Sequence, residues 1–264
     1  MSWRGPAFAM LLVAAAAWVA CADFGSAGDA PADAGAEASV EAGDAGRPIA
    51  DGGGSPGCAR FSDASFCVDF EQPDPLAATV WTAPRTTTDG GTIAVTTARS
   101  VSPSHAASFV MLDGGPACNF LVLERNFTGD FQNVRARAST SVETSGWFFV
   151  VSSHPSNVIS YVLLVSIGEQ SIDLIVQENS DGGPYTKGQA SLPFDTTPLG
   201  IFQDVMVEID TASHIARLTV GARSADATLP PEYTTKDPRL TLGPFCHNTG
   251  QRVLVDDVAV WVTP

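Results

Sequence analysis

The sequence predicts an all-β domain, a sandwich or barrel of antiparallel strands, that follows a leader and a linker. After residue 58 apolar residues recur with a period of two, and Gly-, Pro- and Asp-rich turn signals separate these segments. Four cysteines lie in the same region, which indicates an exported, disulfide-containing fold. The 264-residue chain therefore divides into segments 1–20, 21–57 and 58–264, and the last is long enough for one large domain.

The strand predictions depend on which residues share a face. Asn133–Glu143 alternates small or apolar residues with polar ones, as a half-buried strand does. Asp204–Asp210 alternates in the same way, and a short polar turn leads from it to Ile215–Val220, which predicts a hairpin. More continuously apolar segments, typical of central strands, follow at Trp147–Val151, Tyr161–Ile167 and Ser171–Gln177.

The first 20 residues have the features of an export signal. Arg4 precedes the apolar run Ala7–Ala20, whose 14 residues suit a signal peptide and are too few for a membrane span. The run ends at Val19-Ala20-Cys21, which resembles a bacterial lipobox and implies lipidation of Cys21. Cleavage after Ala22, giving a plain secreted protein, is the alternative. We expect an exported chain, lipid-anchored to the bacterial outer membrane or cell surface.

Residues 21–57 are predicted to be a disordered tether. Of the 36 residues after Cys21, 19 are Ala or Gly and seven are acidic, with Arg47 as the single base. So few large apolar side chains cannot offset the entropy of ordering the chain. The whole chain has a formal charge of −15, which argues against nucleic-acid binding. We expect a monomer that meets the membrane only through its lipid anchor.

The remaining four cysteines allow three disulfide pairings. We expect Cys58–Cys67, which closes a short loop at the start of the domain, and hence Cys118–Cys246. A zinc site is not expected, because the chain has no Cys-x-x-Cys pair and its four histidines are scattered.

Four stretches in order resemble the concanavalin A-like lectin/glucanase jelly roll, of the laminin G-like kind. They are Phe66–Glu71 with Trp81, Ser102–Ser104 with Ala106–Met111, the pair Phe202–Asp210 and Ile215–Val220, and Val253–Val260. The resemblance implies a two-sheet antiparallel jelly-roll sandwich and a glycan as ligand. A galactose-binding-like jelly roll shares the opening and closing features and remains the alternative.

Glu208 and Asp210 are the candidate catalytic residues. Because they are two positions apart on a strand, both carboxylates face the same side. Glucanases that this chain resembles carry Glu-x-Asp-x-Glu on one strand, but here the later positions hold Ala212 and Ser213. A retaining glycosidase needs a second functional carboxyl. We therefore expect a solvated strand face without catalysis.

Binding residues can be proposed from two other sets. Asp69, Glu71, Asp256 and Asp257 come from the two ends of the domain and could converge on a structural calcium ion, since oxygen ligands suit that cation. No other cofactor is expected. Tyr185 and Tyr233 lie in Pro- and Gly-rich loops and, with Trp147, are the candidate rings for stacking on sugars.

Three functions remain open. The first is a lipid-anchored cell-envelope protein whose sandwich binds a glycan or another surface polymer without catalysis. The second is a divergent glycoside hydrolase that uses Glu208 and Asp210. The third is a structural or interaction protein of the envelope with no small ligand.

Overall fold

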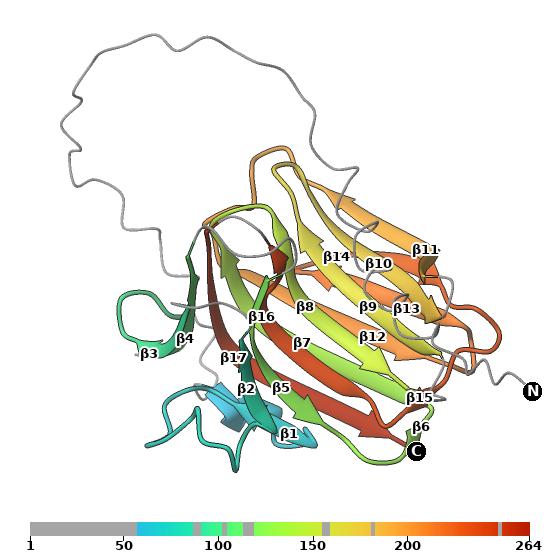
Figure 1. The fold of residues 1–264 in the computed structure, drawn as a ribbon, viewed down its shortest axis with the longest axis horizontal. Coiled ribbons are helices and arrows are strands. Elements are labelled where there is room, and N and C mark those ends of the chain that lie inside the picture. The colour runs from blue at the N-terminus through green and yellow to red at the C-terminus, as the bar shows by residue number, and fades with distance from the viewer. Residues whose placement is uncertain are drawn as a thin grey trace, which may run out of the picture.

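Two β-sheets packed face to face make up the folded part of the chain (Figure 1). The computed structural model describes residues 57–86, 91–101, 105–112, 119–154, 159–180, 183–247 and 250–264. In these ranges a short 3-10 helix, η2 (Gly57–Phe61), precedes the first strand. None of the helical structure described there is long and apolar enough to cross a bilayer.

The eight-stranded sheet carries both ends of the domain. Its strands, in spatial order, are β14 (Arg223–Thr228), β13 (Ile215–Val220), β12 (Gln203–Asp210), β7 (Asn133–Val142), β17 (Gln251–Thr263), β4 (Ala106–Met111) and β3 (Thr92–Thr96). The eighth strand, β1 (Phe66–Val68), pairs with β17 beyond the end of β4. All these pairings are antiparallel.

The seven-stranded sheet forms the second layer. Its strands, in spatial order, are β11 (Gly183–Pro193), β10 (Ser171–Ser180), β9 (Ser160–Ile167), β8 (Gly146–Ser153), β16 (Arg239–His247), β5 (Asn119–Asn126) and β2 (Ala83–Thr86). Two short strands, β6 (Asp130–Phe131) and β15 (Thr235–Lys236), pair with each other and form a separate two-stranded sheet. The prediction of an all-β, two-sheet antiparallel sandwich is confirmed.

Alternating side chains produce the core between the sheets. On β12, Val205, Val207 and Ile209 are each at most 1% exposed and belong to the core cluster. The residues between them turn to the outer face, meaning the side of a sheet directed away from the core. The predicted hairpin of Asp204–Asp210 with Ile215–Val220 is confirmed, because β12 and β13 pair antiparallel along that register.

The closing strand contains a bulge that shapes the candidate sites. Its pairing with β7 shifts register between Asp256 and Ala259, and Asp257 has a φ of 50°. An extra residue in the left-handed region is the mark of one class of β-bulge, and Asp tolerates that region better than most residues. The bulge buries both Asp256 and Asp257, at 0% and 1% exposure.

One side of the sandwich is closed by a tight approach of two edge strands. Strand β11 of one sheet lies against β14 of the other. A Cβ atom added at Gly188 of β11 would be 2.3 Å from the carbonyl oxygen of Thr228 at the end of β14. Glycine is therefore required there by space.

Candidate functional site

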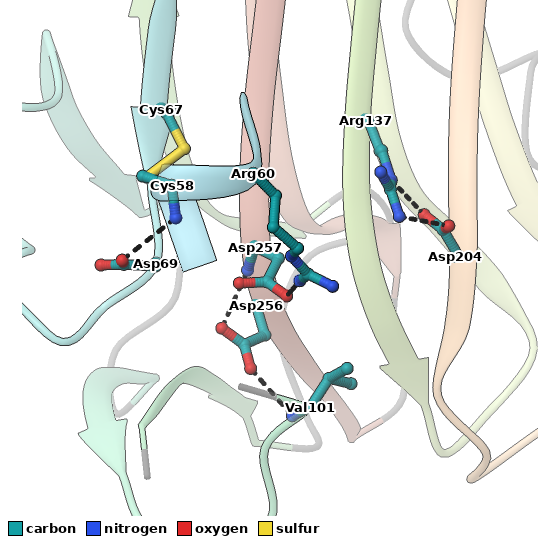
Figure 2. A network of polar contacts seen from close by, with 9 residues as sticks. All are labelled: Cys58, Arg60, Cys67, Asp69, Val101, Arg137, Asp204, Asp256 and Asp257. Carbon is teal, nitrogen blue, oxygen red and sulfur yellow. Dashed lines mark hydrogen bonds and ion pairs between the residues drawn. A yellow bond between two sulfur atoms is a disulfide. The ribbon is translucent and has the colours of Figure 1, made fainter. Parts of the chain in front are cut away.

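Three of the four predicted calcium ligands lie near the place where β1 pairs with β17. Figure 2 shows Asp256 and Asp257 side by side on β17, with Asp69 beside the Cys58–Cys67 bridge. Asp69 accepts a hydrogen bond from the backbone N–H of Cys58 at 3.2 Å. Asp256 accepts from the N–H groups of Val101 and Asp257, both at 2.8 Å. These carboxylates are thus held by donors of the chain itself.

Asp257 is a buried acid with a raised pKa. Its carboxylate pairs with the guanidinium of Arg60, which follows Cys58 in η2 (Figure 2). Burial and, after it, the neighbouring Asp256 raise the pKa of Asp257 to about 6, although Arg60 acts in the opposite direction. The second oxygen of Asp257, Oδ1, is buried and has no hydrogen-bond partner in the described part of the chain.

Glu71, the fourth predicted calcium ligand, is held elsewhere. Its carboxylate accepts a hydrogen bond from the His105 backbone N–H at 2.7 Å and lies 2.8 Å from Nδ1 of the same residue. Among the described residues, no three His, Cys, Asp or Glu side chains are grouped so that they could hold a metal ion. The calcium site stays a prediction, which a calcium titration followed by thermal unfolding would test.

The predicted cysteine chemistry is described in part. The Cys58–Cys67 disulfide is present and links η2 to β1. Cys21, Cys118 and the side chain of Cys246 lie outside the described residues. The neighbours of the last two, Asn119 and His247, are paired across β5 and β16.

Glu208 and Asp210 point to the outer face of the eight-stranded sheet. Asp210 closes the β12–β13 turn: it accepts hydrogen bonds from the Ala212 N–H at 2.9 Å and the Ser213 hydroxyl at 2.7 Å. The hydrogen bonds from Ser213 are the largest of the causes that lower its pKa. An acid that is held ionised in this way is poorly suited to donate a proton.

Glu208 stands between two arginines. The sheet register places it directly opposite Arg135 on β7 and Arg217 on β13. Positions 212 and 213, where the third acid of the pattern would follow on the same strand, are turn residues that cap Asp210. The expectation of a polar strand face fits this arrangement better than a catalytic pair.

A row of aromatic side chains crosses the outer face of the seven-stranded sheet. Trp147 on β8 is opposite Phe245 on β16, and Phe245 is opposite Phe120 on β5. The ring centroids are 6.3 Å apart for Trp147 and Phe245, and 6.2 Å apart for Phe245 and Phe120. All three rings are half-buried. Ser166 on β9 faces Trp147 from the other side and continues the row with a hydroxyl.

The two predicted binding tyrosines lie away from this row. Tyr185, on the edge strand β11, is 48% exposed. Tyr233 is a core residue instead, 3% exposed, with its ring 5.0 Å from that of Tyr161, so it offers no surface for a sugar to stack on. The sequence analysis named one ring of this row, Trp147, did not name Phe120 and Phe245, and was wrong to place Tyr233 at the surface. The part of Trp147 and Tyr185 in binding stays a prediction.

Comparison with known proteins finds solved structures with a similar fold. No family model and no curated protein matches the chain. The endo-β-1,4-glucuronan lyase from the fungus Trichoderma reesei aligns at 10% identity with a TM-score of 0.56, covering 76% of this chain and 96% of that one. The κ-carrageenase of Pseudoalteromonas carrageenovora, solved with an oligotetrasaccharide of κ-carrageenan, aligns at 13% identity with a TM-score of 0.52, covering 83% and 99%.

A third similar structure is the glycoside hydrolase family 16 enzyme of the Bacteroides ovatus mixed-linkage glucan locus. It aligns at 10% identity with a TM-score of 0.52, covering 74% of this chain and 99% of that one. At such low identities the likeness concerns the fold alone. The domain is a concanavalin A-like jelly-roll sandwich.

Proposed function

We propose that this domain binds a glycan on the outer face of the seven-stranded sheet, at the row formed by Trp147, Phe245 and Phe120. The observation that carries the proposal is the alignment of these three rings on adjacent strands. Neighbouring strands are about 4.8 Å apart, so the row extends over about 10 Å. Aromatic rings offer sugars an apolar contact area, while hydroxyls such as that of Ser166 supply orientation.

The fold gives independent support. The similar structures are a glucuronan lyase, a carrageenase in complex with its oligosaccharide, and a glucan hydrolase. These names describe the substrates of those proteins. For this chain they suggest glucuronan, κ-carrageenan and mixed-linkage glucan as the first ligands to test.

We infer that binding occurs without hydrolysis. In the described strands the outer face of this sheet carries two carboxylates, Glu124 on β5 and Asp173 on β10. Three strands separate β5 from β10, so the two backbones are about 19 Å apart along the sheet. Glycosidases of either stereochemistry hold their two carboxyl groups within about 10 Å of each other.

The alternative of a hydrolase based on Glu208 and Asp210 is not favoured. Both residues lie on the other sheet, away from the aromatic row, and Asp210 is engaged by its own turn. A purely structural envelope protein would have no need of the aromatic row, and absence of binding to all test glycans would support it.

We further infer an exported protein with a lipid on Cys21 and residues 21–57 as its tether. The support is the apolar run that ends at Val19-Ala20-Cys21 and the Ala-, Gly- and Asp-rich composition that follows. A tether of this length has a mean reach of about 35 Å as a random coil. Mass spectrometry of the mature N-terminus tests this: an unmodified chain that begins after Ala22 would refute lipidation.

Isothermal titration with mixed-linkage glucan, κ-carrageenan and glucuronan oligosaccharides tests the glycan site. Trp147→Ala is expected to weaken binding of the positive glycan about tenfold or more, because one of the three aromatic contacts is lost. Phe202→Ala is the matched control, since Phe202 is a half-buried aromatic that precedes β12 of the other sheet. Equal affinities of the wild type and Trp147→Ala would remove the basis of the proposal.

A further inference from the structure

A hollow lies on the outer face of the eight-stranded sheet, opposite to the proposed glycan face. Its volume is about 590 Å³. Side chains of β7, β12 and β13 form its floor, and residues after η2, the β12–β13 turn and the end of β17 form its walls. The polar and aromatic lining residues that matter below are Asp63, Arg135, Glu208, Asp210, Arg217 and Trp261.

A ladder of directly opposed residues crosses the floor. The register runs from Trp261 on β17 to Arg135 on β7, Glu208 on β12, Arg217 on β13 and Asp226 on β14. Arg135 lies over the Trp261 ring, with its Cζ atom 4.1 Å from the ring centroid. At the other end, Arg217 makes two hydrogen bonds to Asp226, at 2.7 and 2.9 Å. Both arginines are thus fixed in position.

Arg135 and Glu208 are the two charged members of the ladder that have no ion-pair or hydrogen-bond partner among the described residues, although the charge of Glu208 also acts on Arg217. Within the described residues neither makes an ion pair or a side-chain hydrogen bond, and Nε of Arg135 has no acceptor. The other arginines of this face are engaged, Arg217 by Asp226 and Arg137 by Asp204. The hollow therefore presents one fixed cationic donor and one anionic acceptor on adjacent strands.

The charges around the hollow limit what can bind. Three carboxylates, those of Asp63, Glu208 and Asp210, line it against two guanidinium groups. Because Arg217 is neutralised by Asp226 outside the hollow, the local balance is negative and disfavours anionic ligands. A neutral ligand that both donates and accepts hydrogen bonds satisfies the free carboxylate and the free guanidinium together, and vicinal hydroxyls of a sugar do this.

We propose that this hollow binds the hydroxyl groups of a neutral sugar, with Glu208 accepting and Arg135 donating hydrogen bonds. The site is separate from the aromatic row, because the two lie on the outer faces of different sheets. In this proposal Glu208 is a binding residue, and its position directly opposite Arg135 suits that role. The domain would then bind glycan on the outer faces of both sheets, either two separate polymer chains or two parts of one chain.

Fluorine NMR of the full chain labelled with 5-fluorotryptophan distinguishes the two faces. The chain has five tryptophans, and single Trp→Phe substitutions assign their resonances. Trp261 reports on the hollow and Trp147 on the aromatic row. The probes are cellotetraose, mannotetraose and chitotetraose, with tetragalacturonic acid as the anionic comparison.

At least one neutral tetrasaccharide is expected to shift the Trp261 resonance in a saturable manner, and tetragalacturonic acid is not. Glu208→Gln and Arg135→Met are each expected to raise the dissociation constant read at Trp261 about tenfold, because a hydrogen bond to a charged group is lost. Glu143→Gln is the matched control, since Glu143 pairs with Arg252 away from the lining residues of the hollow.

Two results would overturn the inference: no shift at Trp261 with any neutral probe, or a shift that both variants leave unchanged. A shift at Trp147 alone also overturns it and leaves the aromatic-row proposal standing. A shift at Trp261 alone supports the hollow and counts against the aromatic row.

Discussion

Replacing Asp257 by Asn is expected to change how the free energy of unfolding depends on pH. Asp257 is 1% exposed, and its carboxyl has a pKa of about 6 in the folded chain against 3.8 as its ordinary value. Asn has nearly the same shape, tolerates the observed φ of 50°, and does not ionise. The substitution therefore removes the titration with little change in packing.

The sign follows from proton linkage. Between pH 4 and 6 the folded state keeps its proton on Asp257 while the unfolded state has released it, so the wild type loses stability as the pH rises. A pKa of about 6 against 3.8 corresponds to about 3 kcal/mol lost by pH 7.5. Asp257→Asn does not suffer this loss, so its free energy of unfolding should exceed that of the wild type at pH 7.5 and match it near pH 4.

Urea unfolding followed by tryptophan fluorescence at pH 4, 5, 6 and 7.5 measures the difference. Asp226→Asn is the matched control with the opposite sign, because hydrogen bonding to Arg217 lowers the pKa of Asp226. The Asp226→Asn variant should be less stable than the wild type wherever the carboxyl is ionised, and this difference should shrink, not grow, as the pH falls toward 4. If the wild type and Asp257→Asn gave parallel stability curves across all four pH values, the account of Asp257 would be refuted.

The disulfide and the tight edge each give a further prediction. Replacing Cys58 and Cys67 together by Ser should lower the free energy of unfolding by about 2–3 kcal/mol, the chain-entropy value for a loop closed over a separation of nine residues; urea unfolding with and without reductant measures this, and no difference between the variant and the oxidised wild type would contradict it. Gly188→Ala should cost about 1–3 kcal/mol, because its Cβ would meet the Thr228 carbonyl oxygen at 2.3 Å. Gly168→Ala is its control, since the contact there would be an ordinary 3.6 Å; an equal melting temperature for both variants would argue against close packing of β11 on β14.

Strands with one polar face could be predicted from the sequence because side-chain alternation carries the information. On β12 and β7 the core residues occupy every second position, and the structure follows that pattern. The bulge in β17 could also have been predicted from the order of apolar residues in the sequence. Core valines occupy odd positions at Val253 and Val255 but even positions at Val258 and Val260, which requires one extra residue between them.

The aromatic row could not be predicted from the sequence. Where both faces of a strand are apolar, the alternation of apolar and polar residues does not show which side chains face outward. Phe120 is followed by Leu121, Val122 and Leu123, and only the pairing with β16 shows that Phe120 faces outward. Tyr233 illustrates the converse difficulty. Its Pro-rich surroundings indicate a loop, but composition does not reveal that the loop turns the ring inward onto Tyr161.

The position of β17 has a consequence for how the domain assembles. This last strand lies in the interior of the eight-stranded sheet, between β7 and β4, and it also pairs with β1, the first. A chain that emerges N-terminus first cannot complete that layer until β17 has been synthesised. Folding must then wait for contacts between the most distant parts of the chain, which makes it slow. Loss of the 13 residues of β17 would leave a gap in the interior of the sheet, so a chain cut before Gln251 should not reach the native state.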